Sequence, residues 1–262
     1  MFVVAIPSYN RYNILQKKTL TLLNRFGIDK SKIFIFIVAD EYDLYNTIDP
    51  DLYNQIIIGE VGIVNQRLFI ENYFDCGTHI LSMDDDVVDI IFYKYIPNSF
   101  TDFIQRAFDI CIIENAFIFG LYPVSNLFFV KHNTEYSTKL TYICGAVYGF
   151  INRKLPELNN VLVPLGSDGN KEDVEKSILY WKHDGKVIRF NTTQIKTKYY
   201  GTHGGLGTLT QRIEPMKKYS IILNNAYPNI TKIKIRKNGL YEITLHDNIN
   251  KTSLHSVLVF DD

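Results

Sequence analysis

Tryptophan and cysteine are scarce in this 262-residue chain, which has one tryptophan and three cysteines. Cys76, Cys111 and Cys144 are odd in number and widely spaced, so they predict neither a disulfide framework nor a zinc site, and they suit a reducing compartment. A net charge is also lacking, because 28 Lys and Arg residues balance 28 Asp and Glu residues. No overall field therefore draws the protein to nucleic acid or to an anionic membrane, although a local patch can still do so.

Long apolar runs are missing as well. No segment approaches the roughly 18 consecutive apolar residues that a membrane-spanning helix needs. The apolar run at residues 1–7 has no basic region before it and is too short for the core of a signal peptide. We therefore expect a soluble intracellular protein, in the cytoplasm or nucleus, with no membrane partner. The length suits one large α/β domain.

Short apolar runs followed by polar residues dominate the first half of the chain. Residues 2–6, 33–38, 55–58 and 80–83 are such runs, and helical stretches at about 13–25 and 61–74 lie among them. Strands that alternate with helices predict a mainly parallel sheet flanked by helices. Ligands bind at the carboxyl edge of such a sheet, where all four runs place polar residues.

The fourth run ends in three consecutive carboxylates, Asp84, Asp85 and Asp86. Adjacent like charges repel and are costly to desolvate, so a divalent cation or a set of hydrogen-bond donors is expected among them. A solvated acidic turn after a strand is the alternative reading of this triplet.

The second half of the chain continues with helices, strands and glycines. Ser99 is expected to cap a helix with an apolar stripe, and the glycines at 145 and 149 indicate close approach of the backbone to another group. Residues 232–236 and 241–245 alternate on either side of Asn238-Gly239, which predicts a β-hairpin. We therefore expect a main domain over residues 1–212 and a β-rich extension over 213–262, packed on the same domain.

The order of these features in the first half resembles the GT-A fold of glycosyltransferases, which bind a nucleotide sugar and hold a divalent metal on its diphosphate. The resemblance implies a nucleotide-sugar site with Mn²⁺ or Mg²⁺. It implies a base pocket formed by Pro7, Tyr9 and Arg11, a contact from Asp40 to the base edge, Arg67 beside the diphosphate, Asp84 at the ribose, Asp85 in the same site, and Asp86 on the metal.

Two further groups complete the implied site. Inverting transfer needs a carboxylate base, and the pair Glu172 and Asp173 supplies one after the mid-chain strand, with Asp173 favoured. The alternative is that both residues only stabilise a helix N-terminus, where acidic side chains are favourable by roughly 0.3 to 1 kcal/mol. His203 is implied as a second metal ligand, although a solvated loop histidine is the alternative.

Motifs in the second half narrow the resemblance to the TET-associated glycosyltransferases, which include the base J glucosyltransferase and occur in phages, large viruses and protists. The motifs are Asp84–Val87, Cys144–Phe150, Lys171–Glu175, Asp184-Gly185 followed by Arg189, and Lys196–Tyr200 leading to Gly204–Gly207. This family implies an inverting hexosyltransferase with UDP-glucose as the expected donor. The implied acceptor is a 5-hydroxymethylpyrimidine in viral or host DNA, such as hydroxymethyluracil, and the implied location includes the cytoplasm of an infected host cell.

The sequence offers cations for a DNA acceptor, although a basic alternating strand is also typical of a solvated sheet face. Lys198, Gly204 and Gly205 are the expected acceptor residues, and further candidates are Lys196, Arg212, Lys217, Lys218, Lys232, Lys234, Arg236 and Lys237. Three alternatives remain open: a glycosyltransferase with a protein, lipid or glycan acceptor, a nucleotidyltransferase, and a non-catalytic nucleotide-sugar-binding module. The oligomeric state is not specified by the sequence.

Overall fold

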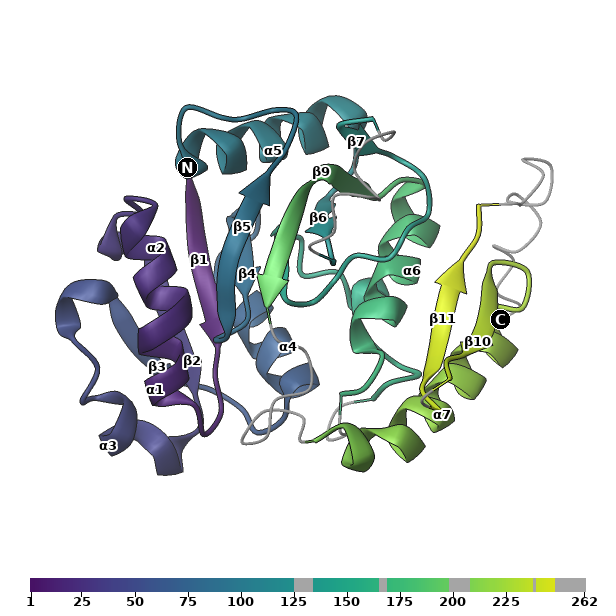
Figure 1. Cartoon of the computed structure of the whole chain (residues 1–262), viewed down its shortest axis with the longest axis horizontal. Helices are drawn as coiled ribbons and strands as arrows, with labels where there is room; N and C mark the ends of the chain where they lie inside the picture. Colours follow the sequence, from purple (N-terminus) through teal and green to yellow (C-terminus); the bar gives the residue numbers. More distant parts are fainter. Residues whose placement is uncertain (125–133, 165–168, 198–207, 238, 248–262) are drawn as a thin grey trace.

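A nine-stranded sheet lies at the centre of the computed structural model, which describes residues 1–124, 134–164, 169–197, 208–237 and 239–247. The strands run in the order β3-β2-β1-β4-β8-β6-β9-β5, and β7 pairs with β9 (Figure 1). Their bounds are β1 Phe2–Pro7, β2 Ile33–Ile37, β3 Gln55–Ile58, β4 His79–Met83, β5 Val87–Phe92, β6 Ile118–Tyr122, β7 Tyr136–Ser137, β8 Val147–Ile151 and β9 Ile188–Thr197.

The first four strands confirm the predicted parallel arrangement. β1 pairs in parallel with β2 and with β4, and β2 pairs in parallel with β3. Their carboxyl ends therefore meet at one edge of the sheet, as required for a site built from strand ends. The sequence runs are apolar because both faces of these strands are covered.

The remaining strands make the sheet mixed. β8 pairs antiparallel with both β4 and β6, whereas β9 is parallel to β6 and antiparallel to β5. The sequence pattern predicts two short strands at 187–190 and 195–199, whereas β9 is a single ten-residue strand. Its register with β6 shifts between Leu121 and Tyr122. β5 follows the acidic triplet directly and was not expected from the sequence.

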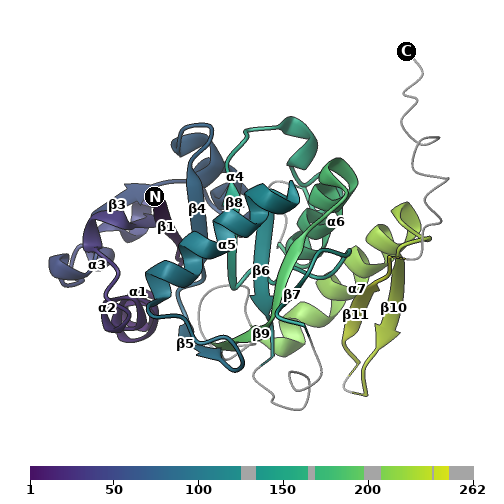
Figure 2. The same cartoon turned by 90° about the horizontal axis from the view of Figure 1, so that it is seen from above.

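Helices cover both faces of the sheet and bury a separate apolar cluster on each. α1, α2 and α5 pack on one cluster, which contains Leu15, Leu22 and Phe108, while α4, α6 and α7 pack on the other, which contains Ile70 and Ile178 (Figure 2). The helices are α1 Tyr12–Leu15, α2 Thr21–Arg25, α3 Tyr42–Tyr45, α4 Ile63–Tyr73, α5 Phe100–Glu114, α6 Glu172–Asp184 and α7 Leu209–Ala226, with 3₁₀ turns at Lys30–Lys32, Ala39–Glu41, Pro50–Leu52 and Pro156–Leu158.

Within the described ranges, no helix combines the length and the apolar character that crossing a bilayer requires. Ser99 caps α5 as predicted, since its hydroxyl accepts from the Asp102 N–H at 3.0 Å. Two further apolar runs that the sequence pattern predicts as strands, residues 127–130 and 257–260, lie outside the described residues.

The C-terminal part consists of α7 and the predicted hairpin, β10 (Thr231–Ile235) and β11 (Tyr241–Leu245). The two strands pair antiparallel, with Ile233 opposite Ile243. They lie beside α7, at the opposite end of the molecule from β3 and α3 (Figure 1). The boundary predicted at residue 212 falls inside α7, a helix that the sequence reading did not include.

A π-helical turn, Gln16–Leu20, joins α1 to α2 and fixes the backbone of the acidic triplet. The Thr19 hydroxyl in this turn donates to the Asp84 carbonyl at 2.8 Å and accepts from the Val87 N–H at 3.0 Å. Single π turns in helices are frequent at functional sites. Here the turn lets one side chain bridge the two ends of the triplet.

Replacing Thr19 with valine should lower the free energy of unfolding by roughly 1 to 3 kcal/mol, because valine keeps the shape but leaves a buried carbonyl and N–H without their partner. Urea denaturation measures the change. Thr21→Val is the matched control: the Thr21 hydroxyl donates to the Gln16 carbonyl in an exposed position, so its loss should stay within about 0.5 kcal/mol. Equal losses in the two variants would contradict the bridging role of Thr19.

Candidate active site

The acidic triplet begins where β4 ends, and its three carboxylates point to three different surroundings. The Asp84 N–H donates to the Ala146 carbonyl at 2.8 Å, which continues the pairing of β4 with β8. The Asp84 carboxylate faces Arg67 from α4, with 3.4 Å between Oδ1 and Nη2, and 37% of its side-chain surface is exposed. It is the most exposed of the three carboxylates.

Asp85 and Asp86 share the Arg11 guanidinium. Arg11 Nη1 lies 3.2 Å from Asp85 Oδ1 and 3.3 Å from Asp86 Oδ2. Asp85 is buried and also accepts from the Ser8 hydroxyl at 2.7 Å, whereas Asp86 accepts from the Thr197 hydroxyl at 2.8 Å. Asp86 thus ties the triplet to the end of β9, and Asp85 ties it to the end of β1.

Burial raises the pKa of two of these carboxyl groups toward neutrality. Although its side chain is partly exposed, the surrounding protein limits the hydration of Asp84 and raises its pKa to about 7, and the charges of Asp85 and Asp86 add to this effect against the attraction of Arg67. Burial raises the pKa of Asp85 to about 6, against the opposing effects of Arg11 and Ser8. A strand end that crowds negative charge in this way favours a bound cation.

The acidic residues at the start of α6 have three distinct roles. Glu172 is buried and accepts from Arg67 Nη1. Glu175 is fully buried and accepts from the backbone N–H groups of Val161, Leu162 and Val163 at 2.8 to 2.9 Å, so it anchors a loop to the helix. Only Asp173 is directed at a pocket.

Asp173 is held by groups from the segment that leads into β8. Its Oδ2 accepts from the Tyr142 hydroxyl and, at 3.2 Å, from the Gly145 N–H, and its Oδ1 accepts from the Val174 N–H at 2.9 Å. The Ser177 hydroxyl fastens the same segment to α6, because it accepts from the Ile143 N–H at 2.9 Å. The carboxylate orientation is therefore set by neutral hydrogen-bond donors.

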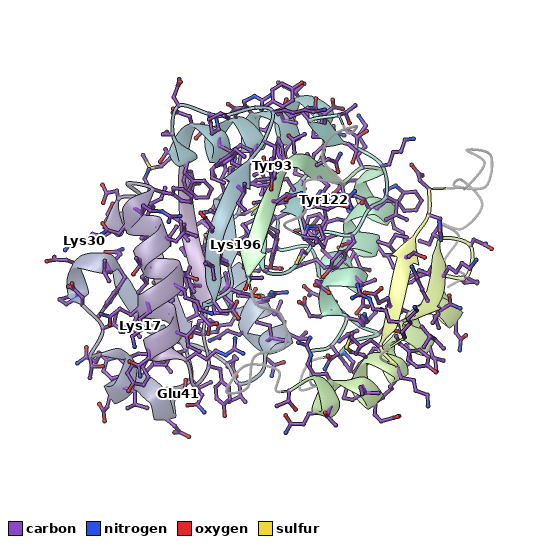
Figure 3. The ribbon with its side chains drawn as sticks, in the orientation of Figure 1. Lys17, Lys30, Glu41, Tyr93, Tyr122 and Lys196 are labelled. Atoms are coloured by element: carbon purple, nitrogen blue, oxygen red, sulfur yellow. The ribbon has the colours of Figure 1, made fainter. Side chains whose placement is uncertain are left out.

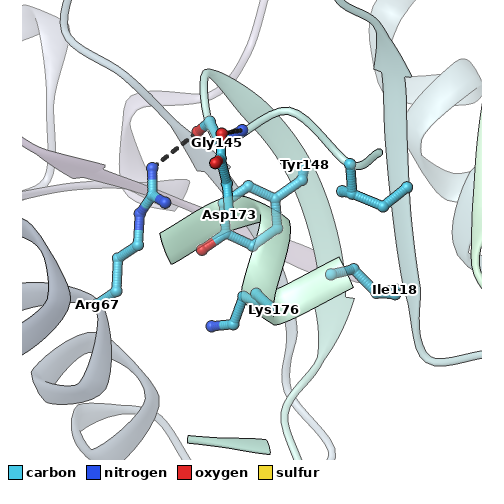
Figure 4. Close-up of a pocket in the computed structure, with 7 residues that line it drawn as sticks. Arg67, Ile118, Gly145, Tyr148, Asp173 and Lys176 are labelled. Carbon is cyan, nitrogen blue, oxygen red and sulfur yellow. Dashed lines mark hydrogen bonds between the residues drawn. The ribbon is translucent and has the colours of Figure 1, made fainter. Parts of the chain in front are cut away.

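Arg67 joins the triplet to the start of α6. This buried guanidinium donates to Glu172, to the Gly145 carbonyl at 2.9 Å and to Asp84, and it lies 5.3 Å from the centre of the Tyr148 ring (Figure 4). A Cβ at residue 145 would lie 2.8 Å from both terminal nitrogens of Arg67. The glycine predicted to mark a close approach therefore makes room for this side chain.

A narrow pocket lies beside these groups and has no room for a group larger than a water molecule. It therefore belongs to the surroundings of Asp173 and is too small for a nucleotide sugar. Its lining is drawn in Figure 4 and consists of Arg67, Ile118, Ile143, Gly145, Tyr148, Asp173 and Lys176.

The residues predicted for the nucleoside lie at the neighbouring ends of β1 and β2. Pro7 is buried at the end of β1, while Tyr9 is 52% exposed and Asp40 is exposed in the turn after β2. Glu41, which the sequence reading did not select, accepts from the Asn10 N–H at 2.9 Å, and burial raises its pKa. This hydrogen bond holds the two strand ends together.

Of the predicted residues, the structure joins Arg11, Arg67, the triplet and Glu172 through ion pairs. It adds Ser8, Thr19, Tyr142 and Thr197, which no local sequence pattern distinguishes. His203, Lys198, Gly204 and Gly205 lie outside the described residues. Within the described ranges, no set of three or more His, Cys, Asp or Glu side chains is arranged to hold a metal ion.

Comparison with known proteins gives a match in structure only. No family model and no curated protein matches the sequence. Among solved structures, the chain is similar to residues 1–349 of S. aureus TarS in complex with UDP-GlcNAc (13% identity, TM-score 0.50), and the match covers 86% of this chain and 66% of that one. It is also similar to the mannosyltransferase PcManGT from Pyrobaculum calidifontis in complex with GDP-Man and Mn²⁺ (13% identity, TM-score 0.55, 87% of this chain and 64% of that one).

A third similar structure is GalNAc-T7 with UDP, GalNAc and Mn²⁺, at 11% identity and a TM-score of 0.52. The match covers 86% of this chain and 47% of GalNAc-T7, so the chain spans between about half and two thirds of the proteins it resembles. At these identities the likeness establishes the fold. The chain has the GT-A fold predicted from its sequence, with a C-terminal hairpin beside it.

Proposed function

We propose that this chain is a metal-dependent glycosyltransferase that moves a hexose from a UDP-sugar, with UDP-glucose as the expected donor, to the hydroxyl of a 5-hydroxymethylpyrimidine in DNA. The Arg67 network carries this proposal, because one buried guanidinium bonds both Asp84 of the triplet and Glu172, the neighbour of Asp173. A donor held at the triplet and a base on α6 would then form one site. The nucleotide sugars bound by the similar structures support the donor class.

The triplet is suited to a divalent cation that binds together with a diphosphate. Mg²⁺ and similar ions are commonly held by one or two carboxylates plus substrate phosphates, which fits a strand end that offers two partly exposed carboxylates, Asp84 and Asp86. We assign Asp86 to the metal and Asp84 to the ribose, with His203 as a further metal ligand. When bound, such a cation stabilises the charge that develops on the departing diphosphate.

Asp173 is assigned as the catalytic base. Its carboxylate takes the proton of the acceptor hydroxyl while that oxygen bonds to the anomeric carbon and the bond from this carbon to the diphosphate breaks. Attack opposite the leaving group inverts the anomeric configuration. The Tyr142 hydroxyl and the Gly145 N–H hold Asp173 in place. Glu172, paired with Arg67, is assigned as a positioning residue.

The nucleoside is assigned to the ends of β1 and β2, where Tyr9 and Asp40 are exposed and Pro7 forms the floor. Arg11 is committed to Asp85 and Asp86, so we assign it to the support of the triplet, together with the buried Asp85. Arg67 is buried among its partners in the same way. These assignments distinguish the side chains that contact the nucleotide sugar from the side chains that hold those residues in position.

The DNA acceptor rests on the second-half motifs and on the cations near the proposed site. Lys196 is exposed on β9, one residue before the threonine that binds Asp86, and Lys232 and Lys234 are exposed on the hairpin. Phosphate contacts from such side chains make binding dependent on salt. Lys198, Gly204 and Gly205 remain the acceptor residues proposed from the sequence.

The metal assignment predicts a selective effect of Asp86→Asn. We expect kcat/KM to fall by roughly 100-fold or more, because one carboxylate ligand of the cation is lost. Mn²⁺-dependent binding of UDP-sugar, measured by calorimetry, should be lost as well. Asp89→Asn is the control, since Asp89 lies three residues further on in an exposed ion pair with Arg25 and should be tolerated. Full activity of Asp86→Asn would remove this residue from the mechanism.

The base assignment predicts different effects at two touching residues. Asp173→Asn should reduce kcat by roughly 100-fold or more, because the group that accepts the proton is gone. Tyr142→Phe should reduce kcat by roughly 10- to 100-fold with little change in KM for the donor, because Asp173 loses a positioning donor. Tyr73→Phe, which removes a hydroxyl that bonds Gln55 in an exposed position, is the control. An unchanged kcat in Asp173→Asn would rule out Asp173 as the base.

The acceptor is tested by mass spectrometry of reaction products. An oligonucleotide that contains 5-hydroxymethyluracil or 5-hydroxymethylcytosine should gain one hexose when incubated with UDP-glucose and Mn²⁺, and the unmodified oligonucleotide should gain none. The KM for the oligonucleotide should rise steeply with salt concentration. Transfer to a glycan, protein or lipid instead would replace the acceptor and keep the enzyme class. Release of pyrophosphate from a nucleoside triphosphate and a sugar phosphate would indicate a nucleotidyltransferase.

A further inference from the structure

Arg189, a partly exposed residue at the start of β9, differs in its partners from the arginines that form ion pairs. Its Nε donates to Asn191 Oδ1 at 3.0 Å, and its guanidinium carbon lies 5.2 Å from the centre of the Tyr122 ring. Neither partner is a carboxylate. By contrast, ion pairs with Asp or Glu are formed by Arg11, Arg25, Arg67, Arg106, Arg153 and Arg236.

The surroundings of Arg189 do not compensate its charge. Within the ranges that the structure describes, Arg189 has no salt bridge, and its recorded hydrogen bond uses Nε alone. Burial lowers the pKa of Arg189, and only Tyr122 opposes this effect. The side chain is only partly exposed, but its terminal nitrogens are not fully buried, so a ligand can reach them. A guanidinium that is partly withdrawn from water and has no carboxylate partner is suited to an anionic ligand.

The geometry of the guanidinium suits an oxyanion. The hydrogen bond to Asn191 and the Tyr122 ring fix the plane of the group, which leaves the two terminal nitrogens as a preformed fork. Such a fork matches the oxygens of a phosphate in a bidentate arrangement. Four buried polar residues follow on the same strand, Asn191, Thr192, Thr193 and Gln194, where a central strand would ordinarily be apolar.

The location is separate from the triplet. Thr197, which bonds Asp86, stands eight residues further along β9, so up to roughly 25 Å of strand separates it from Arg189. Figure 3 labels Lys196 on this strand and Tyr122 on the neighbouring strand β6, and the exposed Lys196 lies between Arg189 and Thr197 in sequence. A ligand that reaches from the triplet to Arg189 would have to be extended, as a polymer is.

We propose that Arg189 is the centre of an anion-binding site that takes a phosphate group, with Tyr122 and Asn191 holding the guanidinium in position. A second step, which rests on the proposed function, assigns this phosphate to the backbone of the acceptor DNA, at a distance from the modified base. The site then contributes to acceptor affinity and has no part in the chemistry.

Arg189→Met tests the site without any transfer reaction. Inorganic phosphate, compared with sodium chloride at equal ionic strength, should raise the Tm of the wild-type chain by a few degrees, and this rise should be absent in Arg189→Met. The Tm of the variant without phosphate should stay within about 2 °C of that of the wild type, because Arg189 has no ion pair to lose and methionine has a similar length.

Arg153→Met is the matched control. Arg153 also lies over aromatic rings, 3.9 Å from the centre of Phe117, but it forms two hydrogen bonds of 2.7 Å with Asp184. Its loss should lower the Tm by roughly 5 °C or more and leave the phosphate effect unchanged. An equal phosphate effect in wild type and Arg189→Met, or a loss of Tm in Arg189→Met as large as in Arg153→Met, would overturn the anion site.

Acceptor kinetics then identify the source of the phosphate. In Arg189→Met the KM for the hydroxymethylated oligonucleotide should rise roughly tenfold with kcat unchanged, as expected for one charge-assisted contact. A lost phosphate effect with an unchanged KM would keep the anion site and overturn its assignment to the acceptor strand. If DNA is not glycosylated at all, the proposed function fails while the Tm measurements still decide the site.

Discussion

The buried guanidinium of Arg67 is the interaction on which the geometry of the site depends. A desolvated cation needs acceptors around it, and these come from three places: Asp84 after β4, the Gly145 carbonyl before β8, and Glu172 at the start of α6. Because the three acceptors converge on one group, the strand end and the helix start cannot shift independently. The GT-A sheet supplies the carboxyl edge at which the site lies, and the interactions of Arg67 fix the position of the start of α6 at this edge.

The charged residues of the site fall into two groups. Some hold other side chains in place, and others remain available to a substrate. Arg11 is shared by Asp85 and Asp86, and Arg67 by Asp84 and Glu172. Asp173 is held instead by a tyrosine hydroxyl and backbone N–H groups. A carboxylate that is fixed by neutral donors keeps a defined direction without a direct hydrogen bond to a cation, which suits a group that must accept a proton.

The sequence was sufficient for the parallel half of the sheet and for the first turn of α6, because apolar runs and helical spacing are local signals. The sequence was insufficient to predict which side chains bind the carboxylates of the site. Arg67 and Glu172 are 105 positions apart, and nothing in the neighbourhood of either residue records the pair. The sequence was also insufficient to predict α7. This helix has 18 residues, but it contains Pro215 and its apolar residues follow the helical spacing only weakly. Local pattern therefore predicted the elements of the parallel half, and tertiary contacts decided what their charged residues do.

Glycine was the one local signal that pointed at a tertiary contact. The embedded glycines before and within β8 indicated that something comes close to the backbone. At residue 145 that group is Arg67, and at residue 149 it is the Phe119 ring, which would lie 2.2 Å from an added Cβ. Neither neighbour is a ligand, so the two glycines serve the assembly of the protein itself. A glycine beside a predicted site thus marks where a supporting side chain enters as readily as where substrate binds, and only the structure distinguishes the two.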